Sequence, residues 1–319
     1  MRIAVIGAGM AGLSCADGLV HTGHEVTVLD KGRGPGGRMS TRRVATPAGE
    51  IALDHGAQYF TARSPGFRQQ VDAWAAQGVV ASWPLPDPAA WIGTPGMNAV
   101  IKAMAAGRDV RWRVQVDRIE RDGDGWRLHA GGDVLDGFDA VVLAIPAEQA
   151  VPFLSLHDFT MAREAMLARS QPCWTALFAF DRVLPGSADM IRDTGNIGWA
   201  VRNSCRPGRA GDAEVEGWVV QARPEWSQAH LEDDADSVAQ ALLAELSDAL
   251  GAPVPQPTVS MGHRWRYAMS AGLGHGALWN ERIGLGVCGD WLLGPRVECA
   301  WLSGQQLARA MVEEARLTG

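Results

Sequence analysis

The sequence predicts an α/β fold in which a Rossmann-like nucleotide-binding domain with an antiparallel β-meander is joined to a mixed-sheet α+β domain. Three observations predict it. A short apolar strand at residues 2–6 runs directly into a glycine-rich turn and an apolar helical segment at 10–20. Short strands separated by turns of Gly and Asp follow one another between 110 and 145, and a strand and helix after 283 repeat the first pattern. Because a strand, glycine turn and helix present backbone N–H groups to phosphates, we expect the chain to bind a dinucleotide.

The glycine turn has the pattern G-x-G-x-x-G at residues 7–12. In such a turn Gly7 permits the tight bend, Gly9 lets the backbone approach a pyrophosphate, and Gly12 lets the helix pack closely on the strand. A second strand at 25–29 ends at Asp30, where an acidic side chain can bind the hydroxyl groups of a ribose. The candidate cofactor-binding residues of this unit are Gly7, Gly9, Met10, Ala11, Gly12, Asp30 and Lys31.

Two loops after the second strand carry further candidate ligands. Residues 32–38 are rich in glycine and end at Arg38, and such a loop can offer backbone donors and an arginine fork to phosphate oxygens. Residues 54–60 (Asp-His-Gly-Ala-Gln-Tyr-Phe) have neither helical nor strand periodicity, so we expect them to line a ligand site. These loops contribute the candidates Gly37, Arg38, Met39, Gly56, Ala57 and Gln58.

The order of the elements predicts a discontinuous first domain. The expected strands of the meander and of the adjoining main sheet are 110–119, 126–130, 134–135 and 140–145. The second domain is expected to hold strands and one helix near 174–180, 197–201, 216–222 and 234–250. We therefore assign residues 1–66, 95–148 and 281–319 to the nucleotide-binding domain, and residues 67–94 and 149–280 to the substrate domain.

Composition excludes several classes of partner and site. A net charge of -7 without a basic cluster argues against nucleic acid and against an anionic membrane surface. The longest apolar stretch, 140–147, is far shorter than the ~20 residues that span a bilayer. The five cysteines are odd in number and contain no C-x-x-C, so we expect reduced thiols and no metal site. The chain opens on a strand with no signal segment, which favours the cytoplasm, and we expect a monomer or weak homodimer.

Four motifs resemble a family of flavoproteins: Gly36–Arg42, Asp54–Tyr59, Arg264–Ala268 and Val297–Gly304. Together with the glycine turn and the meander, they are similar to the superfamily that contains flavin amine oxidases and folds like p-hydroxybenzoate hydroxylase. Within it the motifs resemble renalase-like oxidases, bacterial ones in particular. A weaker likeness runs through residues 199–209 and 218–227.

The resemblance implies non-covalently bound FAD and assigns residues to it. Val116 would hydrogen-bond the adenine through its backbone, and Asp290 would hold the ribityl or pyrophosphate region. The backbone at Val297, where the closing helix begins, would face the flavin N1 and C2 oxygen, and a helix N-terminus stabilises negative charge there. The candidates added in this way are Val116, Gly289, Asp290, Arg296, Val297, Glu298 and Ala300.

The resemblance also implies an activity: oxidation of isomeric dihydronicotinamides, 2- or 6-dihydro-NAD(P), to NAD(P)+, with O2 reoxidising the flavin to give hydrogen peroxide. The catalytic candidates around the flavin ring are Gln58, Tyr59, Trp265 and Tyr267. A further set could meet the phosphates of the substrate or could form a simple surface loop: Asn203, Arg206 and Arg209.

Two other functions stay open. A flavin amine oxidase shares the nucleotide framework, but such oxidases commonly place an aromatic residue just before the closing helix, where this chain has Arg296. An arginine there would repel an ammonium group. A flavin-binding redox sensor without turnover is the alternative of another class, and an exposed cysteine of low pKa beside the flavin would favour it.

Overall fold

A mostly parallel six-stranded sheet forms the base of the molecule. The computed structural model describes residues 1–184, 186, 188–209 and 215–315. The strand order is β18 (Leu278–Asn280), β19 (Leu285–Val287), β12 (Ala140–Leu143), β1 (Arg2–Ile6), β2 (Glu25–Asp30) and β8 (Asp109–Trp112). All neighbours are parallel except β18 and β19. Every residue of β12 is buried, as expected for a central strand of a sheet that is covered on both faces.

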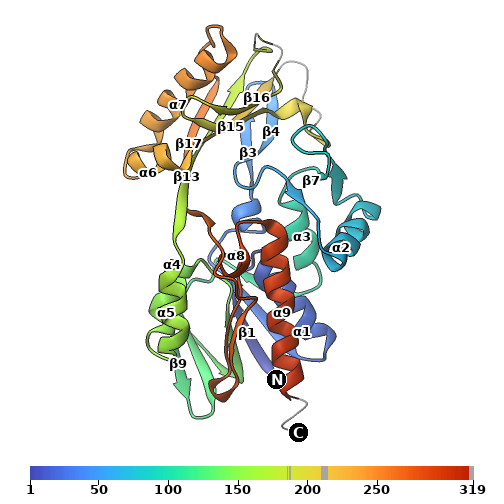
Figure 1. Ribbon diagram of the computed structural model, residues 1–319, viewed down its shortest axis with the longest axis vertical. Coiled ribbons are helices and arrows are strands. Elements are labelled where there is room, and N and C mark those ends of the chain that lie inside the picture. The colour runs from blue at the N-terminus through green and yellow to red at the C-terminus, as the bar shows by residue number, and fades with distance from the viewer. Residues whose placement is uncertain (185, 187, 210–214, 316–319) are drawn as a thin grey trace.

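The first and last helices pack side by side on this sheet. They are α1 (Met10–His21) and α9 (Val297–Ala315), and Figure 1 shows them next to each other beside β1. The two helices come so close that a Cβ atom on Gly304 would lie 2.2 Å from the carbonyl oxygen of Ala11. Glycine is therefore required at this position. The short helix α3 (Ala99–Ala105) also packs on α1.

The antiparallel meander that the sequence predicts is present. Its strands are β9 (Val116–Asp122), β10 (Gly125–Ala130) and β11 (Asp133–Phe138). The prediction of one strand over 110–119 is wrong, because Arg113 has φ +63° and breaks the extended chain. β8 therefore joins the parallel sheet, and β9 begins the meander.

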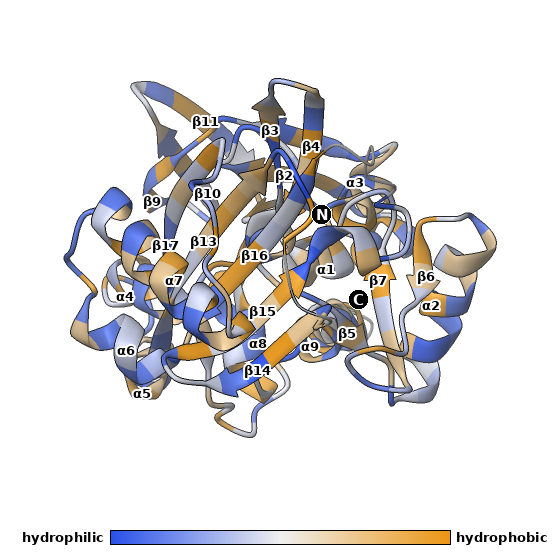
Figure 2. Cartoon of the chain, turned by 90° about the horizontal axis from the view of Figure 1, so that it is seen from above, coloured by the Kyte–Doolittle hydropathy of each residue, from blue (hydrophilic) through white to orange (hydrophobic). Residues whose placement is uncertain are grey.

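A five-stranded antiparallel sheet stands above the base, as Figure 1 shows. Its strand order is β14 (Met190–Thr194), β15 (Ile197–Arg202), β16 (Glu216–Ala222), β13 (Ser170–Phe180) and β17 (Val259–Ser270). Helices α6 (Pro224–Ala229) and α7 (Ala235–Leu250) cover one face, and α7 buries Val238, Leu242 and Leu246 against the sheet. Figure 2 shows this sheet from above, with hydrophobic residues recurring along β15. The other face packs on a hairpin, β3 (Thr41–Thr46) and β4 (Gly49–Asp54).

Short elements complete the chain. A three-stranded sheet of β5 (Phe60–Thr61), β7 (Ala90–Gly93) and β6 (Val80–Ser82) is flanked by α2 (Pro65–Ala76). The remaining elements are α4 (Ala147–Leu154), α5 (Phe159–Leu167), α8 (Asp290–Leu293) and the 3-10 turns η1 (Gly37–Met39), η2 (Asn203–Cys205) and η3 (Glu281–Ile283). The predicted fold class is confirmed. In the part of the chain that the structure describes, no helix combines the length and the apolar character that crossing a bilayer requires.

Candidate active site

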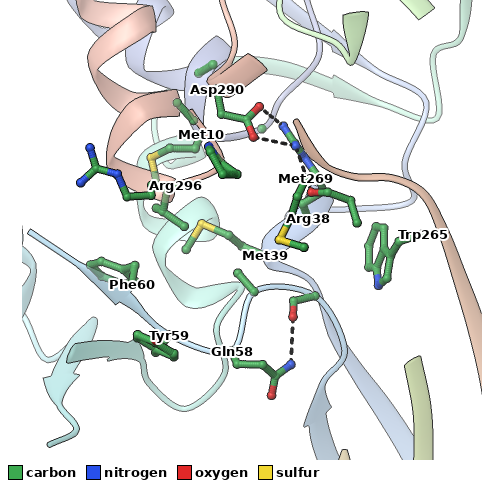
Figure 3. Close-up of a pocket in the computed structure, with 18 of the residues that line it drawn as sticks. Met10, Arg38, Met39, Gln58, Tyr59, Phe60, Trp265, Met269, Asp290 and Arg296 are labelled. Atoms are coloured by element: carbon green, nitrogen blue, oxygen red, sulfur yellow. Dashed lines mark hydrogen bonds and ion pairs between the residues drawn. The ribbon is translucent and has the colours of Figure 1, made fainter. Parts of the chain in front are cut away.

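A cavity of about 490 Å³ opens where the parallel strands of the base end. Its wall comes from the start of α1, the loops before and after the β3–β4 hairpin, the loop before β7, and the starts of α8 and α9. Strands β5, β13, β15, β16 and β17 complete it. This is the carboxyl edge of the sheet, the place where open α/β folds bind ligands. The predicted residues on the wall are Gly9, Met10, Ala11, Arg38, Met39, Gly56, Ala57, Gln58, Tyr59, Trp265, Gly289, Asp290, Arg296, Val297 and Ala300. Figure 3 shows the middle of this wall.

The glycine turn has the shape that a pyrophosphate needs. Gly7 has φ +109°, and a Cβ on it would lie 2.5 Å from the carbonyl oxygen of Ala144. A Cβ on Gly12 would lie 2.0 Å from the carbonyl oxygen of Gly7, whereas a Cβ on Gly9 would meet nothing within 4 Å. Gly7 and Gly12 are thus needed for the tight packing of the turn. Gly9 faces open space beside the free N–H groups of the first turn of α1. These residues fit a dinucleotide cofactor.

Several predicted cofactor ligands lie off the cavity wall. Asp30 accepts hydrogen bonds from the backbone N–H groups of Ala8 (2.7 Å) and Gly32 (2.6 Å), so it holds the glycine turn in place. The others outside the lining are Gly7, Gly12, Lys31, Gly37, Val116 and Glu298. The ribose contact of Asp30 and the adenine contact of Val116 stay predictions.

Arg38 and Asp290 bind each other at one end of the site. The two guanidinium nitrogens of Arg38 donate to the two carboxylate oxygens of Asp290, at 2.8 Å and 2.5 Å (Figure 3). Burial opposes the charge on Arg38, but Asp290 more than compensates and raises the pKa of the guanidinium. The sequence predicts two separate cofactor contacts here, and the structure brings both groups into one ion pair.

Gln58 and Trp265 are held rigidly on the wall. The Gln58 side-chain amide donates to the carbonyl oxygens of Asp54 (2.8 Å) and Gly56 (2.9 Å), and its oxygen accepts from Arg206 (3.0 Å). The Trp265 indole nitrogen donates to the carbonyl oxygen of His55 at 2.8 Å. Neither side chain is free to turn.

Tyr267, another catalytic candidate, does not line the cavity. Gln171 and Cys173 of β13 pair with Met269 and Trp265 of β17, so β17 has extra residues between these two pairs. This bulge breaks the regular alternation of side chains between the two faces of the sheet. Ala268 and Met269 therefore reach the wall in its place.

Two histidines pack behind Trp265 and are neutral at neutral pH. His55 stacks on the indole with ring centroids 5.3 Å apart, and His263 contacts both rings edge-on. Burial, and then the neighbouring His263, lowers the pKa of His55 to about 3. Burial, and then Arg42, lowers the pKa of His263 to about 4. The two rings thus support Trp265 as uncharged aromatic neighbours.

Arg206 and Arg209 are neither a surface loop nor open to a substrate phosphate, which corrects both expectations. Both are buried and form ion pairs with the buried carboxylate of Asp54. Asn203 is buried as well, with 8% of its surface exposed. Burial alone would raise the pKa of Asp54, but the two arginines hold it below its usual range. These side chains join the end of β15 to the hairpin strand β4.

Glu298, which the sequence places among the cofactor ligands, does not line the cavity and binds the backbone just before α2. Its carboxylate accepts from the backbone N–H groups of Arg63 (3.0 Å) and Ser64 (2.6 Å), at the start of α2. The other oxygen accepts from Arg296 at 3.0 Å. Glu298 therefore ties α9 to α2 and steadies Arg296, which does line the cavity.

The sequence singled out Tyr59 but not Trp199, the second member of an aromatic pair on the wall. Tyr59 and Trp199 both line the cavity, with ring centroids 5.6 Å apart and planes at 35°. The guanidinium carbon of Arg192 lies 4.7 Å from the Trp199 ring centroid and 5.9 Å from that of Tyr59. The only sequence signal was the weak likeness that begins at Trp199, because the three residues come from distant segments.

The cavity also exposes one thiol. Cys173 lines the wall, and burial raises its pKa to about 11. The redox-sensor alternative requires a cysteine of lowered pKa, so Cys173 does not favour it. All five cysteines are free thiols.

The fold and the cavity together define a class, the FAD-dependent oxidoreductases. A family model described as flavin containing amine oxidoreductase matches residues 85–312, and one described as NAD(P)-binding Rossmann-like domain matches residues 5–74. The first match covers more than two thirds of the sequence. The chain belongs to the flavin-containing amine oxidoreductase family, and its cofactor is FAD.

Solved structures share the fold at low sequence identity. Cyclohexylamine oxidase from Brevibacterium oxydans IH-35A superposes with a TM-score of 0.70 at 16% identity, covering 99% of each chain. An oxidoreductase from Methanosarcina mazei gives a TM-score of 0.67 at 15% identity, covering 97% of this chain and 100% of that one. These likenesses support the architecture alone.

Curated relatives match over one short segment. An L-amino-acid oxidase of Daboia russelii is 54% identical over 42 residues, which are 13% of this chain and 8% of that protein. A 4,4'-diapophytoene desaturase of Staphylococcus aureus (strain Newman) is 52% identical over 40 residues, 12% of this chain and 8% of that protein. The matches thus span less than a tenth of either relative.

Proposed function

We propose that this protein is an oxidase that takes a hydride from 2- or 6-dihydro-NAD(P), releases NAD(P)+ and passes the electrons to O2, giving hydrogen peroxide. One observation carries the choice of substrate: the aromatic pair on the cavity wall is closed. Tyr59 and Trp199 are in ring-to-ring contact at 5.6 Å, a distance typical of two aromatic rings packed on each other. The two rings therefore cannot hold a substrate amine between them as an aromatic cage, whereas a flat dihydronicotinamide ring can pack against their cavity side.

The charged groups of the wall do not select a protonated amine. Arg38, Arg63 and Arg296 line the cavity, and so do Asp87 and Asp290. Asp290 is engaged by Arg38, and Asp87 accepts a hydrogen bond from the backbone N–H of Ala89 at 2.8 Å. Arg38 is paired with Asp290 and Arg296 with Glu298, which leaves Arg63 and Asp87 as lining charges of opposite sign. A dihydronicotinamide is a strong hydride donor without a positive charge on its ring, and it needs orientation more than acid–base help.

The roles of the chain's own residues follow from their positions. FAD, when bound, accepts the hydride and returns the electrons to oxygen. We propose that Gly9 and the first turn of α1 hold its pyrophosphate, and that the Arg38–Asp290 pair lies beside it. The N-terminus of α9 at Val297 would favour negative charge at the flavin ring. Gln58 and Trp265, both fixed by hydrogen bonds, would form the flat walls between which the substrate ring is oriented.

We further propose that the FAD is bound without a covalent link and that the protein acts in the cytoplasm as a monomer or weak homodimer. Cys299, the cysteine of the closing helix, is buried with 3% exposure and supports the first part. The net charge of -7 supports small-molecule partners over nucleic acid or an anionic membrane.

An amine oxidase is the second candidate, favoured by the family and by the likeness to cyclohexylamine oxidase. The two functions are separated by mixing the FAD-loaded protein, without oxygen, with purified 2- and 6-dihydro-NAD, their phosphorylated forms, NADH, cyclohexylamine and phenylethylamine. Flavin absorbance is followed by stopped flow. We expect rapid bleaching by a dihydro isomer and none by either amine. Bleaching of the flavin by an amine alone would show that the protein is an amine oxidase. No bleaching by any of these compounds would contradict both functions.

A further inference from the structure

A charged side chain from outside the cavity lining touches the aromatic wall. Arg192 lies on β14 directly across from Trp199 on β15, and its guanidinium covers that indole and reaches over Tyr59. Its Nη2 donates to the carbonyl oxygen of Pro86 at 2.7 Å. This bond fixes the guanidinium against the loop before β7, so Arg192 does not swing freely in solvent.

We propose that Arg192 is a specificity-determining residue, which disfavours cationic substrates and favours neutral or anionic ones at the aromatic wall. This inference rests on the proposed function for the identity of the substrate. It adds a reason why that substrate carries no positive charge. Arginine stays charged at every physiological pH. Because the negative faces of Tyr59 and Trp199 already interact with this guanidinium, an ammonium on their cavity side gains less from the rings and is repelled by the like charge.

The proposal can be given a magnitude. Two unit charges on the order of 8–10 Å apart, at an effective dielectric constant of about 20 to 40, change a dissociation constant by roughly fourfold to thirtyfold before salt screens them. Arg192 is exposed to solvent and salt screens its charge, so a change of about threefold is the expectation at moderate salt. This change in the dissociation constant should become smaller as salt is added, because salt screens charges. A change caused by the shape of the wall would not depend on salt.

Asp87 provides a reciprocal position on the same wall. It lines the cavity one residue after Pro86, the acceptor of the Arg192 hydrogen bond. Among the described residues, no ion pair within 4.0 Å joins Asp87 to Arg192. Replacing Asp87 by asparagine removes the opposite charge from almost the same place. The two variants should therefore shift charge preference in opposite directions.

The test uses three flat probes of similar size: phenyltrimethylammonium, benzamide and benzoate. Their dissociation constants are measured on the FAD-loaded protein from the change in flavin absorbance, at low and high salt. The variants are Arg192→Gln, Arg192→Lys and Asp87→Asn, with Arg182→Gln as control, since Arg182 is exposed and pairs with Asp181 away from the cavity. None of the probes is a substrate, so the result does not depend on which compound the protein oxidises.

We expect the wild-type protein to bind benzoate more tightly than the cation. Arg192→Gln should tighten the cation about threefold or more, weaken benzoate by a similar factor and leave benzamide unchanged. Arg192→Lys should restore the wild-type order, Asp87→Asn should shift the preference further toward benzoate, and Arg182→Gln should have no effect.

Equal changes for all three probes would mean that Arg192 only shapes the wall and would overturn the proposal. A wild-type protein that binds none of the probes, or binds the cation as tightly as benzoate, would also overturn it. If Arg192→Gln fails to fold, Asp87→Asn and Arg192→Lys still test the proposal. If the probes bind in the expected order but no dihydronicotinamide reduces the flavin, the proposed substrate is rejected. The selection by charge at Arg192 then still holds.

Discussion

Arg38 and Asp290 form a two-pronged ion pair at one end of the cavity, although they lie 252 positions apart in sequence. Arg38 comes from the glycine-rich loop and Asp290 begins α8, so the pair joins the first and last parts of the nucleotide-binding fold. Arg38 also approaches the carbonyl oxygen of Ala268 on β17 at 3.4 Å. A single interaction thus fixes three segments of the cavity wall.

We predict that Arg38→Ala and Asp290→Ala each weaken FAD binding by tenfold or more while the chain remains folded. Each change leaves a charged partner without its counter-ion, and the double variant should lose little beyond either single variant because the two groups act as one. FAD content after gel filtration and the dissociation constant by fluorescence measure the effect. Arg127→Ala, which removes an ion pair of the meander, is the control. Stoichiometric FAD in both single variants would contradict the prediction.

The glycine turn allows a test that separates folding from cofactor binding. Gly9 has φ -83° and ψ -174°, which alanine adopts readily, and its Cβ position is open. Gly9→Ala should leave the unfolding temperature of the apoprotein unchanged and reduce FAD affinity by tenfold or more, because the methyl group enters the space for the pyrophosphate. Thermal unfolding and FAD titration are measured together.

Gly12→Ala is the matched comparison. Its methyl group would collide with the backbone of Gly7 at 2.0 Å, so the turn itself should be destabilised by about 1–3 kcal/mol or more. If Gly9→Ala binds FAD normally, the pyrophosphate does not lie where we propose.

Trp265 and Tyr267 should behave differently despite lying two residues apart. Trp265→Leu should retain FAD and slow flavin reduction by the preferred donor, because a flat wall of the cavity is lost. Tyr267→Phe should have no effect on reduction, since this side chain does not line the cavity. Rate constants from anaerobic stopped flow decide the matter. Slower reduction in the Tyr267 variant alone would mean that the reactive ring lies on the other side of β17.

The histidines behind Trp265 should make stability depend on pH. The ordinary pKa of histidine is near 6.5, whereas His55 and His263 titrate at about 3 and about 4 in the folded protein. Between the folded and the unfolded pKa values of these histidines, the unfolded chain binds more protons than the folded chain. The free energy of unfolding should therefore rise as pH increases from about 4 to 6.5 and then level off.

The measurement is urea unfolding across that range, comparing the wild type with His263→Gln. His263 is partly exposed, so we expect the variant to reduce the rise by about 1–2 kcal/mol. An identical pH dependence in both proteins would show that His263 does not contribute.

Local sequence patterns predicted most of the cofactor half and little of the outer wall. The glycine turn, the loop ending at Arg38 and the start of α9 depend on residues close together in the chain, and their spacing carries the geometry. Arg206 could not be assigned in this way, since its partners Gln58 and Asp54 are about 150 residues distant. Tyr267 was misplaced because a bulge shifts the alternation of its strand, and a bulge leaves no clear mark in one sequence.

The close packing of α9 on α1 also bears on how the protein is made. β1 and α1 are synthesised well before β19, α8 and α9, which complete the sheet and the cavity. Contacts between residues so far apart in sequence form slowly. Until α9 packs on α1, the apolar face of the N-terminal half stays exposed. The cavity is therefore complete only after α8 and α9 have been translated, and we expect FAD to bind only then. A chain truncated before residue 290 should be a target for chaperones and proteases rather than a partly active enzyme.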